Sequence, residues 1–364
     1  MFEYIGAIHV HSIFSDGSGE VTDIAALAGE SGLDFVILTD HNTLRALKDG
    51  YEGWYNKTLL LVGCEINDKE NKNHYLAFNI DDTFSTRISA KEYVKKVKDA
   101  GGIGFLAHPH EKRTHMKEHP PYPWVEWDTE DFTGIEIWNH MSEWMEYLTE
   151  QNKYQNFVHP LKSIIKPQDE TLNLWDKLNL KRHVTGIGGI DAHAHKYNVL
   201  GFFEVEVFPY KVLFKSIRTH ILTKTEITPG NDLNGFPEAK KMIYASLEKG
   251  SCFVANDYHG DSRGFRFFAE TKNKIYGMGE SIEEVGKFLL RVMVPAPSSE
   301  IRLISNGTVI DSVIDNECEF IIDKMGAYRV EVYLNGNAWI YSNHIRVGLK
   351  TNSIIKTQSD YIMD

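Results

Sequence analysis

The sequence opens with MFEYIGAIHVHSIFSDGSGE (Met1–Glu20), in which a short apolar run ends in two histidines and is followed by a carboxylate. Alternate residues on a β-strand point to the same face, so His9 and His11 are expected to project side by side. Two neutral imidazoles satisfy one another poorly, whereas a single metal ion can bind both. This stretch therefore suggests a metal site at the end of the first strand, with Asp16 close by.

Apolar runs alternate with helical patterns over the first 208 residues. The runs are 4–10, 34–39, 59–64, 75–80, 103–107, 134–138, 184–190 and 199–207. They are apolar on both faces, which is typical of buried parallel strands. The segments between them carry helix signals, such as the predicted capping box of Ser89 and Glu92. This number of alternating units predicts a parallel barrel.

After about residue 264 the pattern changes to short strands separated by turn residues. The expected strands are 288–294, 300–304, 318–322, 328–334 and 339–347, and Asn335-Gly336 is a hairpin signal. This series predicts a small antiparallel β-sandwich, preceded by a helix from Pro237 to about Gly250. The expected domains are a barrel over residues 1–261 with inserted loops at 111–133 and 141–183, a β-rich domain over 262–350, and a loosely held tail over 351–364.

The composition limits the class of protein. A chain of 364 residues with 42% hydrophobic and 25% charged residues is typical of a globular protein. The net charge of −12 argues against a dedicated nucleic-acid binder, because phosphate backbones attract lysine and arginine. Three widely spaced cysteines suggest no disulfide framework, and neither a signal peptide nor a membrane-spanning run is visible. We therefore expect a cytoplasmic protein without membrane or nucleic-acid partners.

Histidines and carboxylates gather where the predicted strands end. Thirteen of the 16 histidines precede residue 196. In βα barrels the carboxyl ends of the strands meet on one face, where the chemistry takes place. Imidazole and carboxylate ligands without thiolate suit Zn, Mn or Fe. The residues at these ends are His9, His11, Asp16, Asp40, His41, Glu65, His108, His110, Glu136, His140, Asp191, His193 and His195, while His74 precedes a strand.

These motifs resemble the PHP family, named for polymerase and histidinol phosphatase. The matching pieces are His9-Val10-His11, Ser15-Asp16-Gly17, Thr39-Asp40-His41, Gly63-Cys64-Glu65, Ala107-His108-Pro109 and Asp191-Ala192-His193, over roughly residues 3–208. The resemblance implies an α/β fold, a distorted (β/α)7 TIM-like barrel with up to three metals on one face. The implied ligands are His9, His11, Glu65 and Asp191 for the first metal, Glu65, His74 and His108 for the second, and Asp16, His41 and His193 for the third.

The resemblance also implies a function. A PHP-type phosphoesterase would use two or three divalent transition metals, Zn, Mn or Fe, to hydrolyse a small phosphate ester by attack of metal-bound hydroxide on phosphorus. The expected catalytic residues are Glu65, Asp191 and His193. The expected substrate-binding residues are His110, Arg113, His140 and His195, and an arginine can bind phosphate bidentately. Tryptophans of the inserted loops, Trp124, Trp127, Trp144 and Trp175, either wall the pocket or pack the loops together.

Two other functions remain open at this stage. A metal-dependent amidohydrolase of the barrel type also begins with an H-x-H motif. Such dinuclear sites often need a modified lysine at a strand end, whereas Glu65 occupies the bridging position here. A non-catalytic module that binds metal or recognises a partner is the second alternative. The C-terminal β domain is predicted to carry no catalytic group.

Overall fold

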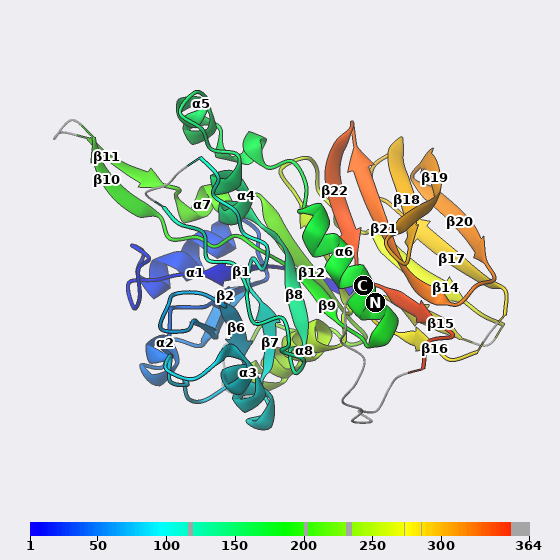
Figure 1. The fold of residues 1–364 in the computed structure, drawn as a ribbon, viewed down its shortest axis with the longest axis horizontal. Helices are drawn as coiled ribbons and strands as arrows, with labels where there is room; N and C mark the ends of the chain where they lie inside the picture. Colours follow the sequence, from blue (N-terminus) through cyan, green and yellow to red (C-terminus); the bar gives the residue numbers. More distant parts are fainter. Residues whose placement is uncertain (116–118, 200–202, 231–234, 273, 285, 351–364) are drawn as a thin grey trace.

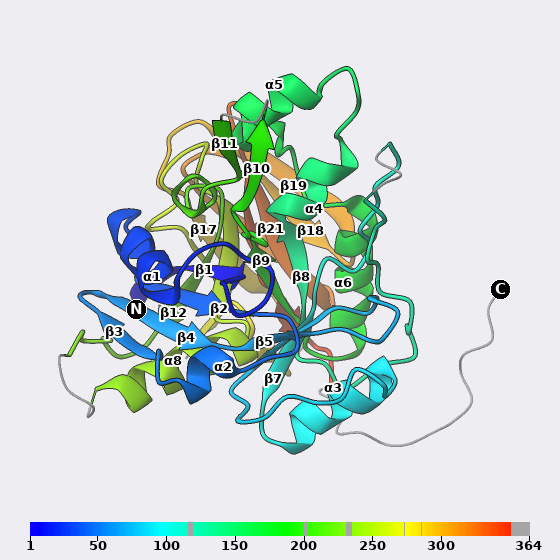
Figure 2. The same cartoon turned by 90° about the vertical axis from the view of Figure 1, so that its left-hand side faces the viewer.

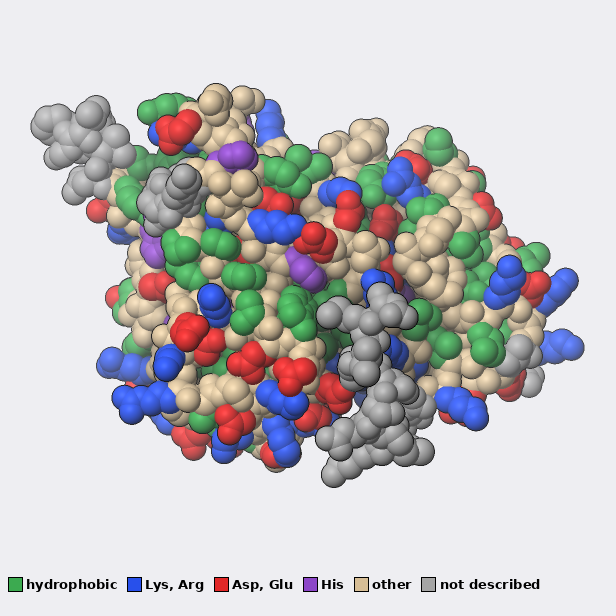
Figure 3. Space-filling model, viewed as in Figure 1, with side chains coloured by type: hydrophobic (Ala, Val, Ile, Leu, Met, Phe, Trp, Pro, Cys, Tyr) green, Lys and Arg blue, Asp and Glu red, His purple; other side chains and the backbone are tan. Residues whose placement is uncertain are grey.

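The computed structural model describes residues 1–115, 119–199, 203–230, 235–272, 274–284 and 286–350. A mixed α/β part, with helices on its outer side, lies next to a β-rich C-terminal part (Figure 1). The predicted tail over 351–364 lies outside the described residues. Among the described helices, none combines the length and apolar character needed to cross a membrane. Acidic and basic side chains are interspersed on the face shown in Figure 3.

Three parallel strands form the first part of the fold. The strands β1 (Phe2–Val10), β2 (Phe35–Leu38) and β4 (Thr58–Val62) are paired so that Ile8 lies opposite Ile37 and Ile37 opposite Leu61. They are joined by α1 (Val21–Glu30), α2 (Arg45–Lys48) and β3 (Gly53–Tyr55). Their central residues are almost completely buried, as the apolar runs predict.

A second sheet contains five strands in the order of the chain. They are β5 (Cys64–Ile66), β6 (Tyr75–Phe78), β7 (Ile103–Leu106), β8 (Gly134–Asn139) and β9 (Thr185–Gly189). The prediction that all strands are parallel is wrong for β6, which is antiparallel to both neighbours. Residues 67–74, between β5 and β6, are too few for a helical crossover. The helix α3 (Ala90–Asp99) begins with the predicted capping box of Ser89 and Glu92.

The long connections carry further helices and an unexpected hairpin. The helices are α4 (His140–Glu146), α5 (Lys153–Val158), the 3-10 helix η1 (Pro160–Ser163) and α6 (Asp169–Lys181). The prediction of one buried parallel strand over 199–207 is wrong. β10 (His195–Val199) and β11 (Phe203–Val207) instead form an antiparallel pair that projects beside α5 (Figures 1 and 2). Acidic residues alternate with valines in β11, which suits a strand with only one covered face.

Two antiparallel strands follow and extend the sheet that contains β1. After α7 (Tyr210–Leu213), β12 (Ile217–Thr223) pairs with β1, and β13 (Cys252–Asn256) pairs with β12. The sequence analysis missed β12. The helix α8 (Phe236–Glu248) carries Pro237 in its first turn and ends just before Gly250, whose φ is +67°. The predicted helix is therefore confirmed.

The two sheets meet at the ends of their strands. Isolated bridges join Val10 to Ala192 and His41 to Glu65, and the backbone N–H of His11 donates to the Ala192 carbonyl at 2.9 Å. These contacts bring the carboxyl ends of β1 and β9 together. Within the described residues the hydrogen-bonded ladders form separate 12-stranded and five-stranded sheets, so closure into a (β/α)7 barrel stays a prediction.

The C-terminal strands are arranged in two layers. The first layer is part of the 12-stranded sheet and contains β16 (Ser281–Ile282), β18 (Ser299–Ser305), β19 (Thr308–Asp315), β21 (Gly326–Leu334), β22 (Asn337–Ser342) and β23 (Ile345–Val347). The second layer is a four-stranded sheet and contains β14 (Arg266–Glu270), β15 (Ile275–Gly277), β17 (Phe288–Met293) and β20 (Glu317–Ile322). One apolar cluster contains Phe267 and Leu290 from the smaller sheet and Val332 from the larger. Because β22 pairs with β13, the large sheet runs across the predicted domain boundary at 261 and 262. The boundaries themselves stay predictions.

Candidate metal centre

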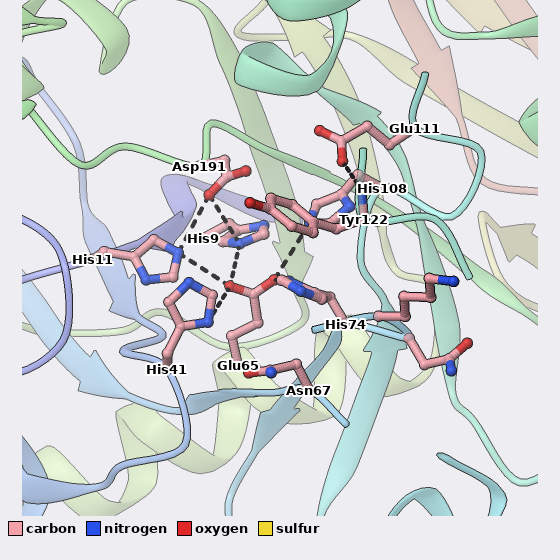
Figure 4. Close-up of polar contacts among 12 residues, drawn as sticks. His9, His11, His41, Glu65, Asn67, His74, His108, Glu111, Tyr122 and Asp191 are labelled. Carbon is pink, nitrogen blue, oxygen red and sulfur yellow. Dashed lines mark hydrogen bonds and ion pairs between the residues drawn. The ribbon is translucent and has the colours of Figure 1, made fainter. Parts of the chain in front are cut away.

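Glu65, at the middle of β5, is the centre of the predicted ligand set (Figure 4). Its side chain is almost completely buried, and its Oε2 atom faces three imidazoles. Oε2 lies 3.1 Å from Nε2 of His9, 3.2 Å from Nε2 of His11 and 3.3 Å from Nδ1 of His41. One carboxylate oxygen therefore has three potential ligand nitrogens around it.

Asp191 completes the first predicted ligand group. Its Oδ1 atom lies 3.2 Å from Nε2 of His9 and 3.3 Å from Nε2 of His11. The ligand atoms of His9, His11, Glu65 and Asp191 all lie within 4.8 Å of one another. This is the set that the family resemblance implies for the first metal.

The other oxygen of Glu65 faces the second group. Oε1 lies 2.7 Å from Nδ1 of His74 and 3.4 Å from Nε2 of His108. The ligand atoms that lie within 4.8 Å of one another on this side belong to His41, Glu65 and His74, and this group does not include His108. The ring of Tyr122 stacks on His74 with a centroid separation of 5.3 Å. Glu65 is thus placed to bridge two cations.

The third group surrounds Asp16. Oδ1 of Asp16 lies 3.3 Å from Nε2 of His193 and 3.7 Å from Nδ1 of His11, and Oδ2 lies 3.7 Å from Nε2 of His41. Asp16 is about half exposed, whereas His11 is buried. His41 therefore lies between Glu65 and Asp16, with one ring nitrogen toward each.

The backbone around these ligands is not regular. His9, His108 and Asp191 have positive φ angles of 69°, 27° and 53°, a region that residues other than glycine rarely adopt. The ladder between β1 and β2 shifts register at His9, so His9 belongs to a bulge, and His11 follows the end of the strand. Such strained positions cluster at functional sites.

The donor atoms fit transition-metal ions. Among the proposed ligands, buried ring nitrogens of five histidines have no hydrogen-bond partner: Nε2 of His9 and His74, both nitrogens of His11, and Nδ1 of His41 and His108. In the first group, imidazole nitrogens lie 3.1–3.3 Å from carboxylate oxygens. Tetrahedral bonds of the usual Zn–N and Zn–O length require separations of about 3.3–3.4 Å between ligand atoms. The first group therefore has the separations that a divalent cation requires.

The charge state of the carboxylates suits the same role. Burial by itself raises a carboxyl pKa, but the neighbouring imidazoles, with that of His9 foremost, hold the pKa of Glu65 and of Asp191 well below the ordinary range. Both groups are ionised at neutral pH, in the state that binds a cation.

Comparison with known proteins finds a domain model that covers most of these ligands. Residues 7–164 match the model of the PHP domain. Residues 7–164 are those of a PHP domain. Most of the predicted ligands fall within the matched residues, whereas Asp191 and His193 follow them in sequence and join them in space.

Similar proteins have been found both by sequence and by structure. An uncharacterized protein of Methanocaldococcus jannaschii is 30% identical over 104 residues, which cover 27% of this chain and 56% of that protein. The chain therefore spans little more than half of this relative's length. A two-domain protein of Bacteroides vulgatus with a predicted PHP-like metal-dependent phosphoesterase is similar in structure at a TM-score of 0.44 and 16% identity, covering 94% of this chain and 95% of that one. An amidohydrolase of Chromobacterium violaceum is similar at a TM-score of 0.32 and 14% identity, covering 52% and 87%.

A second layer of residues fixes the ligands of the PHP domain. Glu136, on β8, accepts a hydrogen bond from Nδ1 of His9 at 2.9 Å and from the backbone N–H of His108 at 2.8 Å. This contact leaves Nε2 of His9 facing Glu65. The absence of a side chain at Gly189 makes room for the Glu136 carboxylate, because a Cβ atom at position 189 would lie 1.8 Å from Oε1 of Glu136. The sequence analysis placed Glu136 at a strand end without assigning it a role.

A cavity of about 480 Å³ opens beside the ligands. It is lined by ligands of all three groups and by two of the four predicted substrate-binding residues, Arg113 and His195. Arg113 is held in place by Glu111, whose Oε1 accepts from Nη2 at 2.7 Å, and by the Tyr122 ring 4.8 Å away. Glu111, His119 and Tyr122 were missed, because nothing in the spacing of the inserted loop distinguishes them.

The other two predicted substrate-binding residues do not line this cavity. The His110 ring is hydrogen-bonded to Oγ1 of Thr171 at 2.9 Å and stacks on Trp127. His140, at the start of α4, is completely buried. Of the four tryptophans expected in the inserted loops, the cavity lining contains Trp144. The structure therefore does not bring His110 or His140 to the cavity.

Proposed function

We propose that this protein is a metal-dependent phosphoesterase that hydrolyses a small phosphate ester. The observation that carries the proposal is the clustering of nine histidine and carboxylate side chains, seven of which line one cavity, with Glu65 between two of the ligand groups. A PHP domain over residues 7–164 supports the same activity. We also propose that the α/β part of the chain is the distorted (β/α)7 barrel that the family resemblance implies.

The proposed cofactors are two or three divalent ions of Zn, Mn or Fe. His9, His11, Glu65 and Asp191 would hold the first ion, Glu65, His74 and His108 the second, and Asp16, His41 and His193 the third. Bound divalent ions supply Lewis acidity, which activates water and neutralises the charge of a phosphoryl group. Asp16 offers an oxygen ligand, which favours Mn or Fe over Zn in the third position.

The chain's own residues bind and orient the ester. Arg113 lines the cavity with its guanidinium fixed by Glu111, so it is ready to donate hydrogen bonds to phosphoryl oxygens. Glu136 keeps the proton of His9 on Nδ1 and so leaves Nε2 available as a ligand. Glu65, Asp191 and His193 are the proposed catalytic positions, since all three face the cavity.

The alternative functions have less support. Among the described lining residues there is no lysine that could be modified to bridge two metals, as an amidohydrolase site often requires. A module that only recognises a partner would have no need for buried, unsatisfied imidazoles, and a module that only binds metal would have no need for an open cavity of about 480 Å³ beside them. The phosphoesterase proposal accounts for both observations.

The proposal is tested by metal analysis and a substrate screen. Protein purified without chelators should contain two or three transition-metal ions per chain by elemental analysis. It should release phosphate or alcohol from at least one member of a panel of monoesters, cyclic esters and diesters. Fewer than one ion per chain after incubation with Zn, Mn and Fe, or no turnover of any ester by metal-loaded protein, contradicts the proposal.

A further inference from the structure

One side of the cavity is apolar, although the other side contains the metal ligands. We define the apolar wall as the described residues from α4, α5, the segment between them and β11 that line the cavity. They are Met141, Trp144, Met145, Leu148, Phe157, Val205 and Val207. The rest of the described lining is polar and contains carboxylates, imidazoles, Arg113, Asn71, Tyr122 and Tyr197. The same space therefore offers a charged end and an apolar end.

We propose that the apolar wall binds the organic group of the substrate, so that the protein prefers phosphate esters of apolar alcohols to those of sugars and other polyols. This inference rests on the proposed phosphoesterase function and assigns its substrate class. A phosphoryl group bound at the ligands and Arg113 leaves its alcohol directed into the remaining space. A volume of about 480 Å³ is within the usual range of small-molecule pockets.

The wall is held together by contacts of its own. The indole of Trp144 packs edge-on against the Phe208 ring, with the two ring centroids 4.9 Å apart. The ring centroid of Phe157 lies 5.7 Å from that of Phe208. The indole N–H of Trp144 donates to the carbonyl of Asn156 at 3.2 Å. The one polar atom of this indole thus has a partner within the protein, and its ring is positioned by packing.

The hairpin contributes its apolar side to the wall. Val205 and Val207 line the cavity, whereas Glu204, next to Val205 in the strand, is exposed and forms an ion pair with Lys196 at 3.2 Å. Alternate residues of a strand point to opposite faces, so the valines face the cavity and the acidic residues face away. A sequence that places its carboxylates outside the pocket keeps this half of it apolar.

An apolar wall selects against hydroxyl groups. A buried hydroxyl without a hydrogen-bond partner loses its hydration without compensation. The side chains of the wall offer no donor or acceptor apart from the Trp144 indole, which is already paired. Hydrophobic pockets discriminate by about 10–200-fold between ligands that differ by one small group. Several hydroxyls should therefore give a preference of at least about tenfold.

The test compares hexyl phosphate with glucose 6-phosphate, since both are phosphates of a primary alcohol and differ mainly in polarity. The kcat/KM of the metal-loaded protein should be at least about tenfold higher for hexyl phosphate. Hexylphosphonate, which is not hydrolysed, should bind by calorimetry, and Met145→Gln should weaken its binding several-fold. Met293→Gln, an exposed position on β17, is the matched control and should leave binding unchanged.

The outcomes separate the two proposals. Equal turnover of the two esters, or a preference for glucose 6-phosphate, overturns the apolar specificity and leaves the phosphoesterase function in place. Binding of hexylphosphonate that Met145→Gln weakens, with no turnover of any ester, supports the wall and overturns the phosphoesterase function. The inference is overturned if metal-loaded protein does not bind hexylphosphonate. It is also overturned if hexylphosphonate binds equally well to the wild type, Met145→Gln and Met293→Gln.

Discussion

Oε1 of Glu136 lies 2.9 Å from Nδ1 of His9, and both side chains are completely buried. The contact joins the middle of β8 to the end of β1, which are 127 residues apart in sequence. It sets which nitrogen of His9 carries the proton and holds the ring so that Nε2 faces Glu65 and Asp191. A carboxylate in this position commonly orients a metal-bound histidine and raises its basicity.

Glu136→Gln should weaken metal binding without removing a ligand. Loss of the carboxylate charge reduces the basicity of His9, and such second-layer changes typically cost about 10–100-fold in metal affinity or activity. Competition with a chelator followed by elemental analysis measures the effect. Glu238→Gln, at an exposed position on α8, is the control and should bind metal like the wild type. Unchanged metal affinity in Glu136→Gln would show that the contact is only structural.

Glu65→Gln should have a larger effect, because Glu65 approaches five imidazoles and belongs to two ligand groups. The change removes one negative charge shared between two proposed ions. We expect at least one ion fewer per chain and a loss of turnover, measured on the same preparations. Full metal content with normal turnover would show that Glu65 does not bridge.

Arg113→Ala should weaken substrate binding and leave the metals in place. The loss of a hydrogen bond from a charged group costs about 1.5–3 kcal/mol, which corresponds to a rise of about 10–100-fold in KM. Arg113→Lys should recover part of this loss, since it keeps the charge but not the forked geometry. Arg263→Ala, at an exposed position, is the control. A wild-type KM in Arg113→Ala would leave Arg113 without a role in binding.

The stability of the fold should depend on pH through a second buried cluster, remote from the metal ligands. Nδ1 of His220 lies 2.9 Å from Oε1 of Glu3, and its Nε2 lies 3.3 Å from Oδ2 of Asp257. Burial disfavours the charged imidazole, but the hydrogen bonds to Asp257 and Glu3 outweigh it and raise the pKa of His220. Burial is likewise outweighed at Asp257, where His220 lowers the pKa to about 2.

The sign of each effect follows from linkage. The contribution of His220 to the free energy of unfolding is fully present below about pH 6.5, its pKa in the unfolded chain. It is lost as the pH rises through the higher pKa that His220 has in the folded protein. That of Asp257 is present above about pH 4 and is lost as the pH falls toward 2. Urea unfolding should show that the stability difference between wild type and His220→Gln shrinks as the pH rises above 6.5. A difference that grows over this range would contradict the assignment.

Asp176→Asn should destabilise the contact between α6 and the C-terminal sheet. Its carboxylate accepts from Nε and Nη2 of Arg329 at 2.7 and 2.9 Å and lies 2.6 Å from Nε2 of His344, all of them buried. Removing one partner of a buried ion pair costs about 3–5 kcal/mol of unfolding free energy. Asp169→Asn, which breaks an exposed pair with Lys166 at the start of the same helix, should cost about 0–1 kcal/mol. Equal effects in urea unfolding would refute the structural role of Asp176.

Local signals in the sequence predicted much of the fold. Apolar runs located most of the buried strands, and the capping residues Ser89 and Glu92 located the start of α3. The direction of the strands was harder to predict from the sequence. The antiparallel pairing of β6 and of the β10–β11 hairpin depends on the length of the connections and on which face of each strand is covered. The strand β12 was missed altogether, and its place beside β1 is a long-range contact.

The sequence by itself determined the chemistry of the site. Histidines and carboxylates at strand ends are ligand types that divalent transition metals prefer, and the nine proposed ligands lie near one another, His108 through its contact with Glu65. Only the tertiary structure decided which atoms face one another, that Glu136 rather than another carboxylate supports His9, and that His110 and His140 lie away from the cavity. The physical reason is that ligand type is a property of single residues, whereas orientation depends on backbone strain at His9 and Asp191 and on packing between distant segments.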